Sequence, residues 1–207
     1  MEKQKFYPMW IALILVIVLI IQSFFPAFTE ILILNENSWT QPWRFLTAIF
    51  LHGGLIHLLY NIIALVIFGL ALEKSIGSKK FLAVFLVSGI LANLISINFY
   101  SSSLGASGAI MGVIGALTII SPLMLVWAFG MILPMIVAAI VYIVIDSIGI
   151  FIPSNVGHIA HLSGIFFGMV FGIIFRVNQK KDKEKTHKIH VPEHILRRWE
   201  TLYMRTD

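Results

Sequence analysis

Cysteine is absent from this chain of 207 residues, which excludes disulfides, thiol catalysis and cysteine-ligated zinc. Charged side chains are also scarce, at 12% of the residues, whereas 58% are hydrophobic. A soluble globular domain needs a more polar surface than this composition provides. The composition therefore predicts an integral membrane protein whose chemistry comes from serine, histidine, asparagine or carboxylate side chains.

Apolar runs that approach the thickness of a membrane occur six times. The first of them follows a basic start, as a signal peptide does, but "QSFFPAFTE" lacks the small residues of a cleavage site, and we expect the run to be retained. The fold class that we predict is an all-α integral membrane protein, a bundle of six transmembrane helices. The runs cover residues 9–25, 55–72, 80–98, 107–121, 124–145 and 157–177.

Basic residues are distributed unequally between the two sides of this arrangement. Of the 15 lysines and arginines, only Arg44 falls on the side away from the termini. The positive-inside rule then predicts a multi-pass protein of the cell membrane with both termini in the cytoplasm. The net charge of +5 reflects this topology, and we expect no nucleic-acid partner.

The chain divides by composition into a cytoplasmic tail (residues 1–8), a six-span domain (residues 9–177) and a basic cytoplasmic tail (residues 178–207). In the last of these, apolar residues recur at helical spacing among arginines, which predicts an amphipathic helix on the anionic inner leaflet, with a partner-binding tail as the alternative. Its histidines are expected to be solvated rather than metal ligands. The apolar residues are Ile195, Leu196, Trp199, Leu202 and Tyr203, and the histidines are His187, His190 and His194.

Polar residues inside membrane spans are costly, so they mark functional sites. Ser107 begins the fourth run, within "SSSLGASGAIMGVIGA", and His57 and Asn61 share one face of the second run at positions i and i+4. His158 and His161 lie at the start of the sixth. These starts all lie on one side of the membrane. The fourth run is short, covering roughly 22 Å of a core about 30 Å thick, so Ser107 is expected below the surface at the depth of the others.

Glycines extend from two of these residues at helical spacing. Small residues on such stripes let two helix backbones approach closely in lipid. We therefore expect the fourth and sixth runs to pack directly, which would bring His161 to Ser107. The stripes are Gly108, Gly112 and Gly115 after Ser107, and Gly164, Gly168 and Gly172 after His161.

A serine hydroxyl becomes a good nucleophile when an imidazole takes its proton. Ser107 and His161 are therefore predicted to form a catalytic dyad. The oxyanion would be stabilised by the backbone N–H of Ser107 and by the side chains of His57 and Asn61. Asp146 closes the fifth run on the same side, but we expect it to be a solvated cap, and hence a dyad rather than a triad.

These motifs resemble the rhomboid family of intramembrane serine proteases. The resemblance covers roughly residues 43–172 and is carried by "WRFLTAIFLHGGLIHLLYNIIALVIFG", "LEKSIG", "GASG" and "AHLSG", in the family's order. It implies Ser107 as nucleophile, His161 as general base, and His57 and Asn61 as the oxyanion-stabilising pair. It also implies structural roles, which fall to His52, Trp43, Arg44, Glu73 and Gly77.

One position departs from the family pattern. Some members carry tyrosine four residues after the nucleophile, stacked on the catalytic histidine, and this chain has Met111 there. A methionine packed on an imidazole is a possible substitute for that contact.

The resulting expectation is an intramembrane serine endopeptidase, without metal or other cofactor, that cuts single-span membrane proteins in or near their transmembrane segment. A rhomboid-like protein that binds membrane clients without cutting them is the main alternative. A transporter or metal site is weaker, because no HExxH occurs and no acidic residue lies mid-span. For substrate entry, the hypothesis is that the fifth helix moves, because Pro134 weakens its backbone ladder and the linker "SIGIFIPSNVG" contains glycine and proline; the apolar first loop is the alternative gate. The histidines of the transporter reading are His52, His57, His158 and His161.

Overall fold

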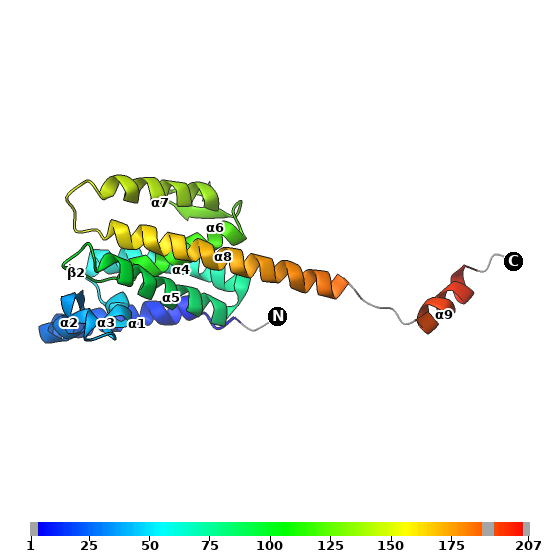
Figure 1. Ribbon diagram of the computed structural model, residues 1–207, viewed down its shortest axis with the longest axis horizontal. Helices are drawn as coiled ribbons and strands as arrows, with labels where there is room; N and C mark the ends of the chain where they lie inside the picture. Colours follow the sequence, from blue (N-terminus) through cyan, green and yellow to red (C-terminus); the bar gives the residue numbers. More distant parts are fainter. Residues whose placement is uncertain (1–3, 188–192, 205–207) are drawn as a thin grey trace. The chain divides into compact units, whose positions relative to one another are not determined.

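The computed structural model describes residues 4–187 and 193–204, and the side chains within these ranges except those of residues 178–187. The chain divides into two compact units, Met1–Phe175 and Arg176–Asp207, which are described separately. The first unit is a bundle of roughly antiparallel helices (Figure 1).

Six apolar helices build this bundle, in agreement with the predicted fold class. Four are long and apolar enough to cross a membrane, by length and composition: α1 (Tyr7–Phe24), α4 (Leu55–Ile76), α5 (Ser78–Ser96) and α8 (His158–His187), the last through residues His158–Val177. The other two, α6 (Ser107–Ile120) and α7 (Met135–Gly149), are apolar but shorter. The chain is therefore a multi-pass membrane protein.

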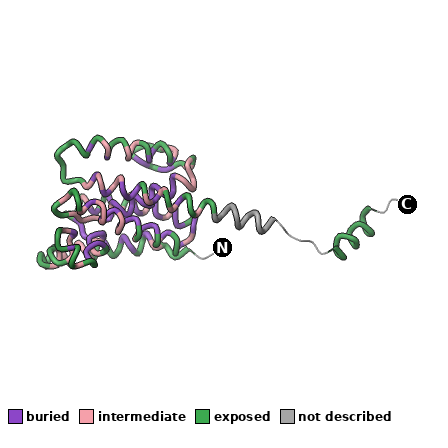
Figure 2. Tube along the Cα trace, viewed as in Figure 1, coloured by how far each residue is buried: buried purple, intermediate pink, exposed green. Residues whose placement is uncertain are grey.

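The short helix α6 lies at the centre of the bundle. Its residues from Gly108 to Thr118 are all buried, and Figure 2 shows that buried residues gather in the middle of this unit. Such a helix has almost no polar side chain to satisfy. Within the span, the Thr118 hydroxyl donates to the carbonyl of Ile114 at 2.8 Å. The burial of α6 fixes the position of its first residue, Ser107.

A structured loop covers the end of the bundle where α6 begins. It contains α2 (Pro26–Leu32), β1 (Leu34–Asn35), η1 (Glu36–Trp39), α3 (Arg44–Thr47) and η2 (Ala48–Phe50). Arg44 is buried, and its guanidinium donates to the carbonyls of Glu30 and Ile33 and to Gln41 Oε1 at 2.7–2.8 Å. β1 also pairs with β2 (Ser102–Ser103), which joins this loop to the segment before α6.

The run predicted as one helix over residues 124–145 is instead a hairpin followed by a helix. β3 (Leu125–Ala128) pairs antiparallel with β4 (Met131–Pro134), and the turn between them places Phe129 and Gly130 at φ values of 54° and 78°. Pro134 ends β4 and caps α7. Since Pro134 lies outside the helical ladder, it cannot weaken it, and the argument for a moving fifth helix from this proline is wrong.

The second unit contains α9 (Glu193–Tyr203), whose residues are all exposed. Arg197 and Glu193 form an ion pair one turn apart at 2.9 Å. The apolar residues expected on one face are present in this helix, and its binding to a membrane stays a prediction. His190 lies outside the described residues.

Candidate active site

A cavity of about 1300 Å³ brings the predicted site residues together. Ser107 from α6, His57 and Asn61 from α4, and His161 from α8 all line it. Its wall also includes the hairpin residues Trp127–Gly130 and Tyr142 of α7. Residues separated by more than a hundred positions in the sequence therefore line one cavity.

Ser107 is the first residue of α6, with Ala106 as the N-cap. Its backbone N–H is one of the first four in the helix and so has no acceptor within the helix. The backbone that leads into Ser107 is held by the hydrogen bond from Gly105 N–H to the carbonyl of Ala48 at 2.9 Å and by the pairing of β1 with β2. Among the described residues the Ser107 N–H has no acceptor, so it is available as a donor beside the serine hydroxyl.

Gly105 lies between His57 and Ser107. Its φ is 126°, a conformation that residues with a side chain rarely adopt. A Cβ at this position would lie 3.0 Å from His57 Nε2 and 3.9 Å from Ser107 Oγ. The absence of a side chain at position 105 therefore leaves open the space that these two groups share.

The protonation of His57 follows from its hydrogen bond to Gly53. The N–H of Gly53 donates to His57 Nδ1 at 3.4 Å, so the neutral ring carries its proton on Nε2, the ring nitrogen that faces Gly105. Asn61 Nδ2 donates one hydrogen to the carbonyl of His57 at 2.8 Å and has a second hydrogen left. Both side chains thus offer an N–H donor at the wall of the cavity.

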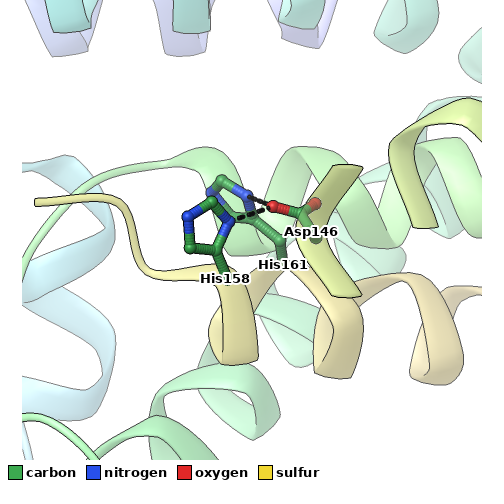
Figure 3. A group of neighbouring side chains, drawn as sticks. All are labelled: Asp146, His158 and His161. Carbon is green, nitrogen blue, oxygen red and sulfur yellow. Dashed lines mark hydrogen bonds and ion pairs between the residues drawn. The ribbon is translucent and has the colours of Figure 1, made fainter. Parts of the chain in front are cut away.

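Behind His161 lies a carboxylate that the sequence interpretation assigned wrongly. Asp146 Oδ1 lies 2.9 Å from His161 Nδ1 and 2.7 Å from His158 Nδ1, and Figure 3 shows the carboxylate pointing from α7 at both imidazoles of α8. The aspartate is 3% exposed. The prediction of a solvated cap is therefore wrong, because the carboxylate is buried and contacts His161.

Close packing of α7 on the start of α8 explains this burial. Asp146 lies one turn before the end of α7, and a Cβ at the last residue of that helix, Gly149, would collide with the His158 ring. The two helix ends therefore approach to ring contact, and water is excluded from the carboxylate. The sequence places Asp146 and His161 at the same membrane side of consecutive spans, but this placement alone does not show that the two side chains meet.

The carboxylate sets the tautomer of His161. Because a carboxylate oxygen accepts hydrogen bonds, the contact with Asp146 Oδ1 favours the tautomer of His161 that carries its proton on Nδ1 and has the lone pair on Nε2. A histidine in this state is a general base. In the described part of the chain no hydrogen bond joins Ser107 Oγ to His161, a contact that often forms only when substrate is bound.

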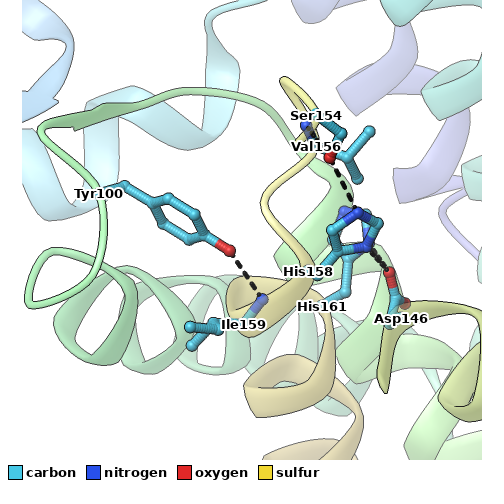
Figure 4. A network of polar contacts seen from close by, with 7 residues as sticks. All are labelled: Tyr100, Asp146, Ser154, Val156, His158, Ile159 and His161. Atoms are coloured by element: carbon cyan, nitrogen blue, oxygen red, sulfur yellow. Dashed lines mark hydrogen bonds and ion pairs between the residues drawn. The ribbon is translucent and has the colours of Figure 1, made fainter. Parts of the chain in front are cut away.

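The start of α8 is held by a polar network (Figure 4). The N–H of Ile159 donates to the Tyr100 hydroxyl at 3.1 Å, and Ser154 Oγ lies 3.1 Å from His158 Nε2. These contacts restrain the first turn of α8, on which His158 and His161 both depend for their position.

His52 does not line the cavity. It is 2% exposed, neither of its ring nitrogens has a partner in the described part of the chain, and its ring meets His57 edge-on with centroids 5.1 Å apart. Burial, with the nearby His57, lowers the pKa of His52 to about 4. Gln22 fixes its backbone by hydrogen bonds to both the N–H and the carbonyl. His52 is therefore a neutral ring packed behind His57.

The predicted packing of the two glycine stripes is confirmed. A Cβ at Gly168 would collide with the carbonyl of Gly112, and one at Gly164 with the carbonyl of Gly108. A Cβ at Gly108 would lie 3.5 Å from the carbonyl of Ala160. The backbones of α6 and α8 are thus in contact, which sets the distance between their first turns.

Met111, the position that departs from the family pattern, also lines the cavity.

Comparison with known proteins gives one family. The family model of the Rhomboid domain matches residues 39–178. Over 148 residues the chain is 34% identical to the putative rhomboid protease YdcA of Bacillus subtilis (strain 168), covering 68% of this chain and 70% of that protein. It is 37% identical over 139 residues to the rhomboid protease GluP of the same organism, covering 66% of this chain.

A plant relative, RHOMBOID-like protein 6, mitochondrial, of Arabidopsis thaliana, is 31% identical over 147 residues, which cover 70% of this chain. The match spans 47% of that plant protein and 26% of GluP. The chain thus covers half or less of the length of these two relatives.

Proposed function

The chain belongs to the rhomboid family, and we propose that it is an intramembrane serine endopeptidase that cuts single-span membrane proteins in or near their transmembrane segment. The family includes proteins named as proteases, of which GluP is one. The observation that carries the proposal is that Ser107, His161, His57 and Asn61 line one cavity.

In the proposed reaction, Ser107 Oγ attacks the scissile carbonyl while His161 Nε2 takes its proton. The carbonyl oxygen becomes an oxyanion, which accepts hydrogen bonds from the Ser107 N–H, His57 Nε2 and Asn61 Nδ2. His161 then gives the proton to the leaving amine, and water, activated by the same base, releases the acyl group. Asp146 stabilises the imidazolium that forms between these steps, in the manner of the third member of a triad.

Substrate access follows from the same cavity. A transmembrane helix hides its carbonyls in its own hydrogen bonds, so a substrate has to unwind before attack. The cavity is lined by α4 on one side and by Tyr142 and the hairpin on another, which gives an unwound segment a route between α4 and α7. We place the site on the non-cytoplasmic side, because all basic residues of the chain except Arg44 belong to the opposite side.

The test is cleavage of a model single-span substrate by the purified protein in lipid, beside Ser107→Ala and His161→Ala. We expect the wild type to cut and both variants to be silent. Cleavage by Ser107→Ala would show that the mechanism is wrong. A wild type that binds such substrates without cutting any of a panel of them would favour the client-binding alternative.

A further inference from the structure

The cluster of Asp146, His158 and His161 contains a second histidine, His158, which the carboxylate does not need in order to orient His161. One Oδ1 atom receives both imidazole Nδ1 atoms, and the three ligand-type atoms lie within 4.8 Å of one another. His158 has no part in the proposed reaction, and yet its Nδ1 shares with His161 Nδ1 the same carboxylate oxygen. Two imidazoles and a carboxylate are a ligand set that Zn²⁺ takes in proteins, with water in the fourth position.

We propose that this cluster is an inhibitory zinc site, an inference that rests on the proposed function of His161. The metal would be bound by Asp146, His158 Nδ1 and His161 Nδ1. Zinc ligands at about 2.0–2.2 Å from the metal in a tetrahedron lie roughly 3.3 Å apart. The O···N distances of 2.7 and 2.9 Å therefore have to open by about half an ångström, which rotation of three side chains provides.

Proton balance explains why the metal inhibits. A neutral imidazole that ligates through Nδ1 keeps its one proton on Nε2. In His158 the Nε2–H then donates a hydrogen bond to Ser154 Oγ, which lies 3.1 Å away and can accept as well as donate. For His161 the same shift puts a proton on Nε2, whose lone pair is the one that must take the proton of Ser107. No proton leaves the protein, but the base is lost.

The cavity gives an ion a route to the cluster, and Ser154 gives His158 a fixed hydrogen-bond partner. His161 and Ser154 line the cavity, whereas Asp146 and His158 do not, so an ion in the cavity reaches the cluster only past the side chain of His161. Ser154 is fixed by the N–H of Val156 at 3.4 Å, and it stands where a ligating histidine has its outer hydrogen-bond partner. The network in Figure 4 thus serves either tautomer of His158.

The first test measures zinc inhibition of substrate cleavage by the full chain in lipid, with each variant compared to its own rate in chelator. We expect zinc to inhibit the wild type, His158→Gln to raise the half-inhibitory concentration by at least about 100-fold, and Ser154→Ala to raise it by about tenfold. His194→Gln, which removes a histidine of the tail, is the matched control and should leave it unchanged. Equal sensitivity of wild type and His158→Gln would overturn the proposal.

The second test does not depend on activity. Zinc binding to Ser107→Ala is measured by titration against a chromophoric chelator, beside the double variants that add His158→Gln or His194→Gln. The proposal predicts one tight site that only His158→Gln removes. The same tight site in both double variants would refute the zinc site even if the protein cuts no substrate, and its selective loss would support the site even if the proposed protease activity fails.

Discussion

Replacing Asp146 by asparagine removes the charge behind His161 and keeps an oxygen acceptor in nearly the same place. Because a single Oδ1 accepts from both imidazoles at 2.7 and 2.9 Å, the amide oxygen can still hold the Nδ1–H tautomer of His161. With the amide oxygen still facing both rings, what is lost is the difference between a hydrogen bond to a charged group and a neutral one, about 1–1.5 kcal/mol. At 1.36 kcal/mol per tenfold, this predicts a fall in kcat of about 5- to 13-fold.

Alanine at position 146 is expected to cost more. It leaves both Nδ1–H donors without an acceptor and lets His161 adopt the wrong tautomer, a state that costs about 10⁴-fold in a Ser-His-Asp triad when asparagine in place of the aspartate causes it. Asp146 is not among the residues that line the cavity, so KM should stay unchanged in both variants. A loss of fold alone would lower the amount of active protein and leave the kcat of the folded fraction the same.

The assay is steady-state cleavage of a model substrate in lipid, with rates expressed per folded protein from a thermal unfolding measurement. Glu73→Gln is the matched control, since Glu73 is also a fully buried carboxylate, bonded to the Ser78 hydroxyl and the Tyr7 N–H rather than to the site. A kcat of Asp146→Asn within twofold of this control would refute the orienting role of the carboxylate.

Two further predictions concern stability. Gly168→Ala should destabilise the protein by about 1–3 kcal/mol, because its Cβ meets the carbonyl of Gly112. The control Gly157→Ala should be tolerated, since the nearest neighbour of its Cβ lies at 3.7 Å. Equal melting temperatures of the two variants in detergent would contradict this packing. His52 has a folded pKa of about 4 against 6.5 when unfolded, so the unfolded state binds its proton first and stability falls as the pH drops from 6.5 towards 4, by up to about 3 kcal/mol. Thermal unfolding over this range should show a weaker pH dependence in His52→Phe, and an unchanged dependence would show that another group is responsible.

The membrane bundle and the set of residues at the cavity could be predicted because they depend on local patterns. Apolar run length marks the helices, and the topology alone puts the starts of the even-numbered spans on one side. Glycine spacing then predicts that the helices that carry Ser107 and His161 pack against each other. These steps need only the helical period and the thickness of a membrane.

The hairpin could not be predicted in the same way. The run 124–145 is apolar throughout, and a continuous apolar run does not distinguish strand from helix by periodicity. The chain turns at Phe129 and Gly130, and phenylalanine is a residue that rarely takes a positive φ. Only the contacts of the folded bundle, among them the ring of Phe129 against that of Tyr142 at 4.6 Å, make this turn favourable.

The role of Asp146 was missed for a related reason. Its place at the end of an apolar run indicated the water boundary, where a carboxylate is usually solvated. Its burial depends on how closely α7 approaches α8 near Gly149, a tertiary contact that no local pattern encodes. The sequence placed the acid on the correct side but did not show that it faces the base.

The central claim, that Ser107 is a nucleophile activated by His161, is tested most directly by labelling the purified protein in lipid with a fluorophosphonate and mapping the modified residue by mass spectrometry. The account predicts one adduct, on Ser107, that forms in the wild type and is abolished by His161→Ala. An adduct on another serine would contradict the account. A protein that is labelled on Ser107 and still cleaves substrate would contradict it as well.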